Sequence, residues 1–281
     1  MDGYLGYIEH RFSDAEIAKM FDAVSGTGAA IYNTYGCLQN QYLVAESEDG
    51  ACVGIYKCTG DKLTKIAYKS INGRFLGKVK PRNIQQQMAL DMLYSTDTTV
   101  KIITGKFGTG KDFLMCAAAV DLLEHNKFEK IVYVRNNIEV KNSKPIGFLP
   151  GNYNEKMAPF AMPMADHLGG IEGLQLMINR GQIEIIHLGF IRGRDIKNSI
   201  ILCSEAENMT KEHIQLLLGR VGEGSALWIN GDFKQCDAEV FRKNSGLMAA
   251  VDKLKGHPRF GYVNLLKTER SETAEMADLL D

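Results

Sequence analysis

The sequence predicts an α/β protein in which a doubly wound, mainly parallel sheet follows a small N-terminal β-rich module. Three observations predict this fold class. A glycine-rich loop at 105–112 directly follows an apolar run, β-branched runs alternate with helical stretches from residue 81 onward, and turn-separated β-like runs precede residue 80. We therefore expect two domains, a small α+β module at 1–80 and a larger α/β domain at 81–281.

Composition limits the class of protein. The 281 residues suffice for one large domain and an appendage, and 45% apolar with 24% charged residues is typical of a globular chain. A net charge of −1 gives no global argument for nucleic acid, so such binding needs a local basic groove. The six cysteines show neither C-x-x-C nor zinc spacing, and the sequence shows neither a signal peptide nor a membrane-spanning run. We expect a cytoplasmic protein with no membrane partner.

The N-terminal module begins with an amphipathic helix at 14–22, which Ser13 is placed to cap. β-Like runs separated by turn signals follow at 41–45, 52–57 and 62–67. The module has too few residues to form a large core of its own.

The second region alternates strands with helices. Six short β-branched runs are expected to form a sheet buried on both faces, at 100–103, 131–134, 183–186, 199–202, 226–229 and 262–265. Helical stretches at 110–125 and 211–218 fall between them. In a doubly wound sheet, ligands bind at the carboxyl ends of the strands, so the loops that follow these runs are where chemistry is expected.

The loop at 105–112 reads Gly-Lys-Phe-Gly-Thr-Gly-Lys-Asp, one letter away from the phosphate-binding pattern G-x-x-x-x-G-K-[ST]. Its glycines let successive backbone N–H groups point toward phosphate oxygens, and the following helix adds the positive end of its dipole. Lys111 supplies a cation for the β- and γ-phosphates, whereas Asp112 replaces the hydroxyl that usually holds Mg²⁺. The predicted nucleotide-binding residues of the loop are Gly105, Lys106, Phe107, Gly108, Thr109, Gly110, Lys111 and Asp112.

A second acidic strand normally completes such a site, and the run ending in Ser204-Glu205 is the candidate. The usual strand ends in Asp-Glu, in which the Asp steadies Mg²⁺ and the Glu polarises the attacking water. Here the loop has gained a carboxylate and the strand a hydroxyl, so the ligand pair is kept with its positions exchanged. A carboxylate beside a triphosphate needs a cation between them, which favours a swapped Mg²⁺ site at Asp112 and Ser204. A decayed site in a catalytically inactive relative is an equal alternative.

Two further stretches point to the same nucleotide. The last buried run before residue 231 leads into Gly-Asp-Phe-Lys-Gln, which places Asp232 and Gln235 where they can sense a γ-phosphate and orient water. Gln86 lies in a glutamine-rich stretch before the first core strand and is a candidate hydrogen-bond partner for adenine. A solvated helix face is the alternative interpretation of that stretch.

These motifs, in this order, resemble the PhoH-like family of ATPases, whose core is akin to the first motor domain of superfamily-one helicases. The resemblance covers residue 80 to the C-terminus, with further matching segments at 133–135, 146–156, 191–194, 205–208, 231–235 and 266–271. It implies a RecA-like P-loop NTPase sheet that binds ATP and Mg²⁺, with Glu205 activating water. Asp232 and Gln235 would contact the γ-phosphate, and Arg270 matches the arginine-serine motif. The departures at Asp112, Ser204 and Glu207 leave open whether ATP is hydrolysed or only bound.

The resemblance also implies partners. Related motors act on nucleic acid, so we expect a single-stranded partner, RNA rather than DNA. Candidate channel residues are Arg135, Lys141, Lys144, Phe148 and Phe160. Because the chain is too short for a second motor domain, a homo-oligomer such as a hexameric ring is the expected way to close the site. The arginines expected to reach across are Arg192, Arg194 and Arg220.

The N-terminal module is similar to the linker of family members that carry a PIN ribonuclease. Residues 1–80 offer no cluster of acidic metal ligands of that kind, so we expect no ribonuclease activity from this chain. Three classes of function stay open. They are an ATP-driven motor on RNA, a catalytically impaired nucleotide-gated binding or scaffold protein, and a P-loop kinase, against which the residues at 231–235 argue.

Overall fold

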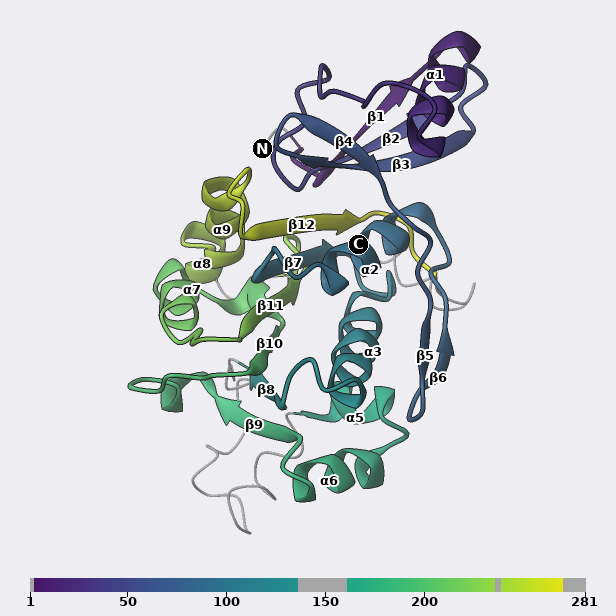
Figure 1. Cartoon of the computed structure of the whole chain (residues 1–281). Coiled ribbons are helices and arrows are strands. Elements are labelled where there is room, and N and C mark those ends of the chain that lie inside the picture. The colour runs from purple at the N-terminus through teal and green to yellow at the C-terminus, as the bar shows by residue number, and fades with distance from the viewer. Residues whose placement is uncertain (1–2, 136–160, 236–238, 270–281) are drawn as a thin grey trace.

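A six-stranded parallel sheet forms the centre of the computed structural model, which describes residues 3–135, 161–235 and 239–269 (Figure 1). Across the sheet the strand order is β12 (Phe260–Leu265), β7 (Val100–Gly105), β11 (Ala226–Gly231), β10 (Ser199–Ser204), β8 (Lys130–Arg135) and β9 (Ile183–His187). All five neighbouring pairs are parallel. The predicted fold class and all six predicted strands are confirmed, each strand extending by one to two residues at one or both ends.

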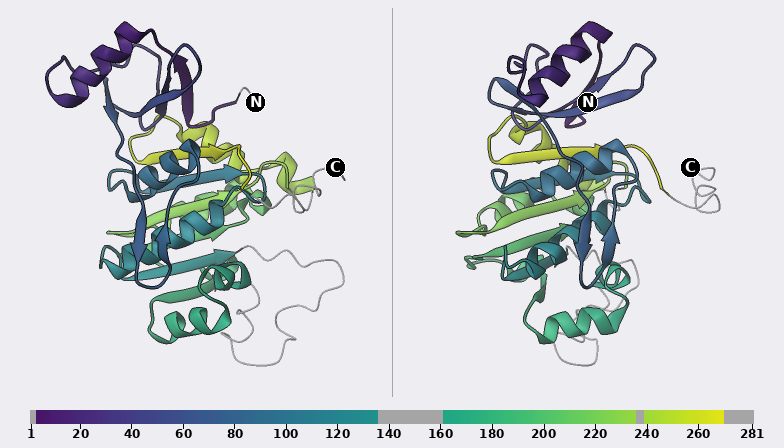
Figure 2. Two further views of the ribbon diagram at one scale, coloured as in Figure 1. Left: turned by 90° about the vertical axis from the view of Figure 1, so that its right-hand side faces the viewer. Right: turned by 45° about the vertical axis from the view of Figure 1, so that its right-hand side comes forward.

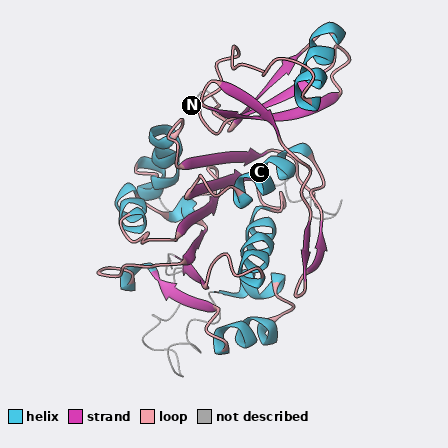
Figure 3. Ribbon diagram, in the orientation of Figure 1, coloured by secondary structure: helices cyan, strands magenta, loops and turns pink. Residues whose placement is uncertain are grey.

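Helices cover both faces of this sheet (Figure 2, Figure 3). Against one face lie α2 (Ile84–Tyr94), α3 (Lys111–Glu124), α5 (Met162–His167) and α6 (Ile171–Asn179). The other face is covered by η4 (Ala206–Asn208), α7 (Lys211–Leu218) and α9 (Gly246–Leu254), with η3 (Leu188–Phe190) and α8 (Glu239–Lys243) in the connections. The predicted helices at 110–125 and 211–218 correspond to α3 and α7.

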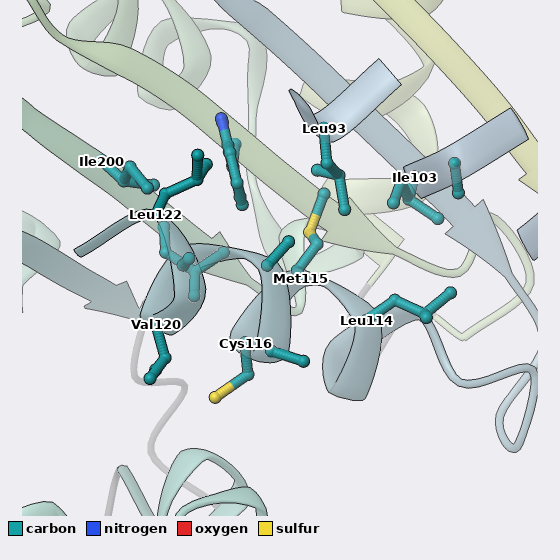
Figure 4. Packing of buried hydrophobic residues seen from close by; sticks show 14 of the residues in the cluster. Leu93, Ile103, Leu114, Met115, Cys116, Val120, Leu122 and Ile200 are labelled. Atoms are coloured by element: carbon teal, nitrogen blue, oxygen red, sulfur yellow. The ribbon is translucent and has the colours of Figure 1, made fainter. Parts of the chain in front are cut away.

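Alternate residues of each central strand enter two different cores. Ile103 packs with α2 and α3, whereas its neighbour Ile102 packs on the α7 and α9 side. Since both faces are covered, the strands are apolar at successive positions rather than alternating, as the sequence pattern predicted. Figure 4 shows the first core, in which Leu114 and Met115 of α3 lie beneath Leu93 and Ile103.

The N-terminal module is a four-stranded sheet with one helix. Its strand order is β1 (Tyr7–Arg11), β2 (Tyr42–Glu46), β3 (Cys52–Thr59) and β4 (Lys62–Lys65), and α1 (Asp14–Ser25) packs on one face. The predicted cap is present, because the Ser13 backbone N–H donates to the Glu16 carboxylate at 2.9 Å. Between α1 and the sheet lies a small separate core that includes Phe12, Met20 and Leu43.

The other face of this module is continuous with the main core. Tyr42 and Val44 of β2 belong to the cluster that α2 and α3 build. At Gly6 (φ +83°) an added Cβ would lie 1.9 Å from the Tyr262 carbonyl oxygen, so the module touches β12 backbone to backbone. A hairpin of β5 (Ile71–Gly73) and β6 (Gly77–Val79) then runs beside α3 (Figure 1). The division into domains at residue 80 stays a prediction.

No helix among the described residues is long and apolar enough to cross a membrane.

Candidate nucleotide-binding site

Polar residues gather where β7, β11, β10 and β8 end. These four strands are consecutive neighbours in the sheet and parallel, so their carboxyl ends meet at one edge. The loop at 105–112 follows β7, Asp232 follows β11, Glu205 follows β10, and Arg135 ends β8. The structure therefore brings together residues that lie up to 127 positions apart in the chain, from Gly105 to Asp232.

The loop after β7 has the backbone shape that its glycines predict. Gly108 and Gly110 have φ of +84° and +83°, the left-handed region that favours glycine. At Gly105 an added Cβ would lie 2.6 Å from the Leu265 carbonyl oxygen, so β12 closes tightly against the loop. Thr109 stabilises the turn, because its hydroxyl donates to the Lys106 carbonyl at 2.9 Å. The loop is thus a preformed turn that leads into α3.

Two neighbouring segments hold this loop from outside. The Gln86 amide is buried, accepts from the Arg82 backbone N–H at 2.9 Å and donates to the Thr109 carbonyl at 3.0 Å. On the other side the Glu269 backbone N–H donates to the Gly108 carbonyl at 2.9 Å. The carboxylate of Glu269 accepts from Asn83, the N-cap of α2, at 2.8 Å. Both ends of the Gln86 amide therefore bind protein groups, which makes this residue a support of the loop; its contact with adenine stays a prediction.

Lys111 and Asp112 open α3. The Lys111 ammonium is nearly buried and lies 3.5 Å from the Lys106 carbonyl and 3.9 Å from the Asp112 carboxylate. Asp112 is more open, with 37% of its side chain exposed. In the first turn of a helix its negative charge is stabilised by the dipole, which makes a carboxylate tolerable there without a ligand.

Asp112 and Ser204 line the same small cavity. Its volume is about 10 Å³, which is room for about one water molecule, and Tyr133, His167 and Asn230 line it as well. Ser204 is buried at the end of β10, and its hydroxyl is 2.6 Å from the Tyr133 hydroxyl. The two residues that exchange chemistry relative to the usual motifs therefore line one cavity at the sheet edge.

Glu205, the candidate water activator, is held in a constrained position. Its φ is +56°, a left-handed conformation that is uncommon for a non-glycine residue and typical of functional turns. The Asn230 side chain accepts its backbone N–H at 3.3 Å. The carboxylate forms a two-pronged ion pair with Arg135, in which one guanidinium nitrogen is 3.2 Å from Oε2 and a second contacts Oε1.

Glu207 connects this turn to the end of β11. Its buried carboxylate accepts the Asp232 backbone N–H at 3.0 Å, and an added Cβ at Gly231 would lie 2.7 Å from the same oxygen. Burial raises the pKa of Glu207 to about 7, opposed by backbone hydrogen bonds. Asp232 is also buried, and its carboxylate accepts the Lys234 backbone N–H at 2.9 Å.

The remaining predicted site residues lie farther out. Gln235 is exposed just before residue 236, where the description is interrupted, and Arg270 and the candidate channel residues 141, 144, 148 and 160 lie outside the described residues. Arg194 pairs with Glu184 of β9 at 2.8 Å, and Arg220 donates to the Arg194 carbonyl at 3.4 Å. Arg192 is exposed. Within the described residues the structure thus gives Arg194 a partner in its own subunit.

A carboxylate and a hydroxyl that line one cavity are oxygen donors of the kind that a small, hard cation accepts. Mg²⁺ in nucleotide sites is held by one or two protein oxygens together with phosphates and waters, and here one carboxylate and one hydroxyl face the same space. Within the described residues no group of three or more His, Cys, Asp or Glu side chains gathers to form an all-protein metal site. The donors present therefore fit a metal that arrives with its nucleotide.

Sequence reasoning missed several residues of this edge. Tyr133 and Asn230 were not expected at the site, and Arg135 was expected in a nucleic-acid channel rather than on Glu205. The signal that points to them is a polar side chain in the last three residues of an otherwise apolar parallel strand. Such positions end at the ligand edge, where a polar group has partners.

A glycine turn that presents Lys111 at the start of α3, together with an acidic turn after a parallel strand two positions away in the sheet, defines a P-loop nucleotide-binding protein. Residues 78–277 match the family model described as PhoH-like protein, and the chain belongs to this family of P-loop ATPases.

Related proteins match over most of this chain. It is 35% identical over 254 residues to protein PhoH2 of Bacillus subtilis, which covers 86% of this chain and 56% of that protein. It is 33% identical over 286 residues to protein PhoH2 of Thermobispora bispora, and the match covers 98% of this chain and 62% of that protein. The chain therefore spans about three fifths of the length of these relatives.

Solved structures with similar folds are more distant. The large terminase of a thermophilic bacteriophage overlaps 71% of this chain and 50% of its own, with 13% identity and a TM-score of 0.41. The Pif1 helicase from Candida albicans overlaps 71% of this chain and 43% of its own, with 14% identity and a TM-score of 0.37.

Proposed function

We propose that this chain hydrolyses ATP and couples the nucleotide cycle to single-stranded nucleic acid, RNA rather than DNA, as a homo-oligomer. The observation that carries the proposal is the cavity shared by Asp112 and Ser204, next to Lys111. A working site with exchanged metal ligands needs one carboxylate and one hydroxyl close to the phosphate-binding lysine, and the lining of this cavity supplies both.

In this proposal each residue has one role. The backbone N–H groups of the loop and Lys111 bind the phosphates, and Gln86 keeps the loop in shape. Asp112 and Ser204 would hold Mg²⁺, which supplies positive charge to the β- and γ-phosphates when bound. Glu205 accepts a proton from the attacking water, while Asp232 and Gln235 contact the γ-phosphate.

The ion pair between Arg135 and Glu205 works against this chemistry. Arg135 contacts both carboxylate oxygens of Glu205, which makes them weaker acceptors for the proton of the attacking water. A γ-phosphate competes for the same guanidinium, because arginine binds phosphate and carboxylate through the same fork of donors. We infer that ATP binding draws Arg135 toward phosphate and releases Glu205.

The same ion pair favours a second function. If Arg135 stays on Glu205 with ATP bound, the protein binds nucleotide without turnover and acts as a nucleotide-gated binding or scaffold protein. Its conformational change would then follow ATP binding rather than hydrolysis.

Nucleic acid and assembly complete the proposal. The likeness of the family core to a helicase motor domain supports a nucleic-acid partner. Hydrolysis of this kind usually needs an arginine that neutralises charge on the transferred phosphate, worth roughly 10³- to 10⁵-fold in rate. Arg192, Arg194 and Arg220 are the candidates to act on a neighbouring subunit, with a hexameric ring as the proposed assembly, and Arg270 the candidate to act within its own.

Steady-state phosphate release tests the proposal, measured with ATP and Mg²⁺ in the presence and absence of single-stranded RNA. The blank is Glu205→Gln, and Lys111→Ala serves as the binding control because it removes the phosphate-binding cation. We expect turnover that RNA stimulates and that both variants abolish.

Two results would change the conclusion. Tight Mg²⁺-dependent ATP binding without turnover would establish the nucleotide-gated scaffold. ATP binding that survives Lys111→Ala would mean that the loop at 105–112 is not the site.

A further inference from the structure

A groove lies at the far ends of α2 and α3, away from the nucleotide loop. It consists of two adjoining pockets of about 470 and 430 Å³ that share Lys69 and Tyr94. The end of β3, β4 and the segment 66–70 form one wall, and the carboxyl ends of α2 and α3 form the other. Gln86 near the start of α2 and Lys111 at the start of α3 lie at the nucleotide loop. Residues near the other ends of the two helices, among them Tyr94 and Asp121, line the groove.

Three lysines line the groove, namely Lys57, Lys65 and Lys69. Two of the three carboxylates that also line it already have partners. Asp91 pairs with Lys69 at 3.6 Å and accepts from the Tyr42 hydroxyl at 2.9 Å, and Asp121 accepts from the Tyr94 hydroxyl at 2.5 Å. The third is Asp97. The wall of β3 and β4 is therefore the basic side of the groove.

A fourth lysine lies beneath the groove. Lys101 is 3% exposed and donates to the Leu93 carbonyl at 2.5 Å and the Ser95 carbonyl at 2.8 Å. Burial, together with the nearby charges of Lys57 and Lys69, lowers the pKa of Lys101 to about 7. These ammonium groups repel one another in a partly dry setting, and an anion in the groove would relieve that repulsion.

The groove also offers an aromatic face and hydroxyl donors. Tyr68 is 57% exposed beside Lys69, and the Lys69 ammonium lies 5.6 Å from the centre of the Tyr94 ring. Lys57 donates to the Ser95 hydroxyl at 3.2 Å, and the Thr59 and Thr64 side chains line the same pocket. Lysines and hydroxyls next to exposed aromatic rings are the groups that proteins use to follow a single strand.

We propose that this groove binds the phosphodiester backbone of single-stranded nucleic acid, with a base stacked on Tyr68. The nature of the ligand rests on the proposed function, but the site itself is separate from the nucleotide loop. Since α2 and α3 join the two sites, a strand held here lies at the other end of the helices that carry Gln86 and Lys111.

Fluorescence anisotropy with a labelled 20-residue oligouridylate tests the groove, at several salt concentrations. The variant is Lys57→Gln with Lys69→Gln, and its matched control is Lys253→Gln with Lys255→Gln on the far side of the sheet. Lys255 suits the comparison because, like Lys69, it pairs with one aspartate and is about as exposed, 40% against 36%. We expect the groove variant to bind at least about 10-fold more weakly and the control to bind normally. The slope of the logarithm of the binding constant against the logarithm of the salt concentration changes by roughly 0.7 for each phosphate contact on a single strand. Loss of two lysine contacts should therefore reduce the size of this slope by about 1.4.

A second pair of variants tests stacking. Tyr68→Ala should weaken binding roughly 5- to 150-fold, as expected for loss of one stacked base. Tyr32→Ala, at a tyrosine of similar exposure (54%) outside the groove, should not. With 4-thiouridine in the strand, the crosslinked peptide should contain Tyr68. Basal ATP turnover should stay unchanged in all four variants, which shows that they fold.

Oligonucleotide binding by the wild type that the groove variants leave intact, or crosslinks only outside the groove, would overturn this inference and leave the proposed function standing. A wild type that binds no oligonucleotide would overturn both.

Discussion

At the scale of single residues, the site depends on which side chain stands at the end of which strand. Asp112 and Ser204 reverse the usual chemistry of their positions, yet they line one cavity. Glu205 is fixed by a left-handed backbone and an ion pair to Arg135. Burial raises the pKa of Glu207 to about 7, which favours the neutral form of this carboxyl below that pH.

The exchanged ligands predict a coupled pair of substitutions. Asp112→Thr alone should lower ATP turnover at least about 10-fold, because it leaves two hydroxyls and no carboxylate for Mg²⁺. Adding Ser204→Asp restores one carboxylate and one hydroxyl, so turnover should recover. Steady-state phosphate release across the four proteins measures the coupling, and additive losses would contradict the exchange.

Glu207 predicts a pH dependence of stability. Because its pKa in the folded chain is about 7, against about 4.3 in an unfolded chain, the folded protein binds the extra proton between these values. The protonated Glu207 therefore makes its full contribution to the free energy of unfolding below about pH 4.3. This contribution is lost as the pH rises through 7. Glu207→Gln removes this loss, so the variant should gain on the order of 3 kcal/mol relative to wild type between pH 4 and pH 8.

Urea unfolding at a series of pH values measures this gain. Glu223→Gln is the control, because that side chain is exposed in the turn after α7. Parallel pH profiles for wild type and Glu207→Gln would show that Glu207 is not the titrating group.

At the scale of elements, α2 and β12 hold the nucleotide loop in place before any ligand arrives. Gln86 comes from the first turn of α2, and the segment after β12 reaches the Gly108 carbonyl. The loop thus starts close to its binding shape, and less ordering is needed when phosphate binds.

Gln86 gives a prediction that separates support of the loop from recognition of adenine. If Gln86 only supports the loop, Gln86→Ala should weaken ATP and GTP binding by the same factor, about 5- to 100-fold for two lost buried hydrogen bonds. If it also recognises adenine, ATP binding should suffer more than GTP binding. Titration calorimetry with both nucleotides measures the difference, with Gln87→Ala, the next residue of the same helix, as the control.

At the scale of the whole molecule, the N-terminal module is attached to the sheet by direct hydrogen bonds and not only through the connecting chain. The buried Asn40 side chain donates to the carbonyls of Pro258 and Phe260, both at 2.9 Å, just before and at the start of β12. The Leu5 carbonyl accepts the Asn264 backbone N–H at 2.9 Å. The module therefore has the contacts to unfold together with the sheet.

Asn40→Ala tests this attachment. It removes the donor from the buried Phe260 carbonyl and from the Pro258 carbonyl, and it places alanine at φ +63°, so it should cost about 2–4 kcal/mol. Asn126→Ala is the matched control, since Asn126 has a similar φ of +54° but is exposed, and it should cost only about 1–2 kcal/mol. Urea unfolding should give one cooperative transition; two separate transitions would show that the module unfolds on its own.

The sequence by itself determined the sheet, its six strands and the loop at 105–112, because these depend on local patterns of apolar and glycine residues. It also determined the family. Only the tertiary structure decided that Asp112 and Ser204 share a cavity, that Arg135 binds Glu205, and that the lysines at 57, 65 and 69 face one groove. These contacts join residues that lie far apart in the chain, such as Arg135 and Glu205, 70 positions apart. The order of the strands in the sheet and the packing of the helices determine these contacts, and local sequence patterns do not specify either of them.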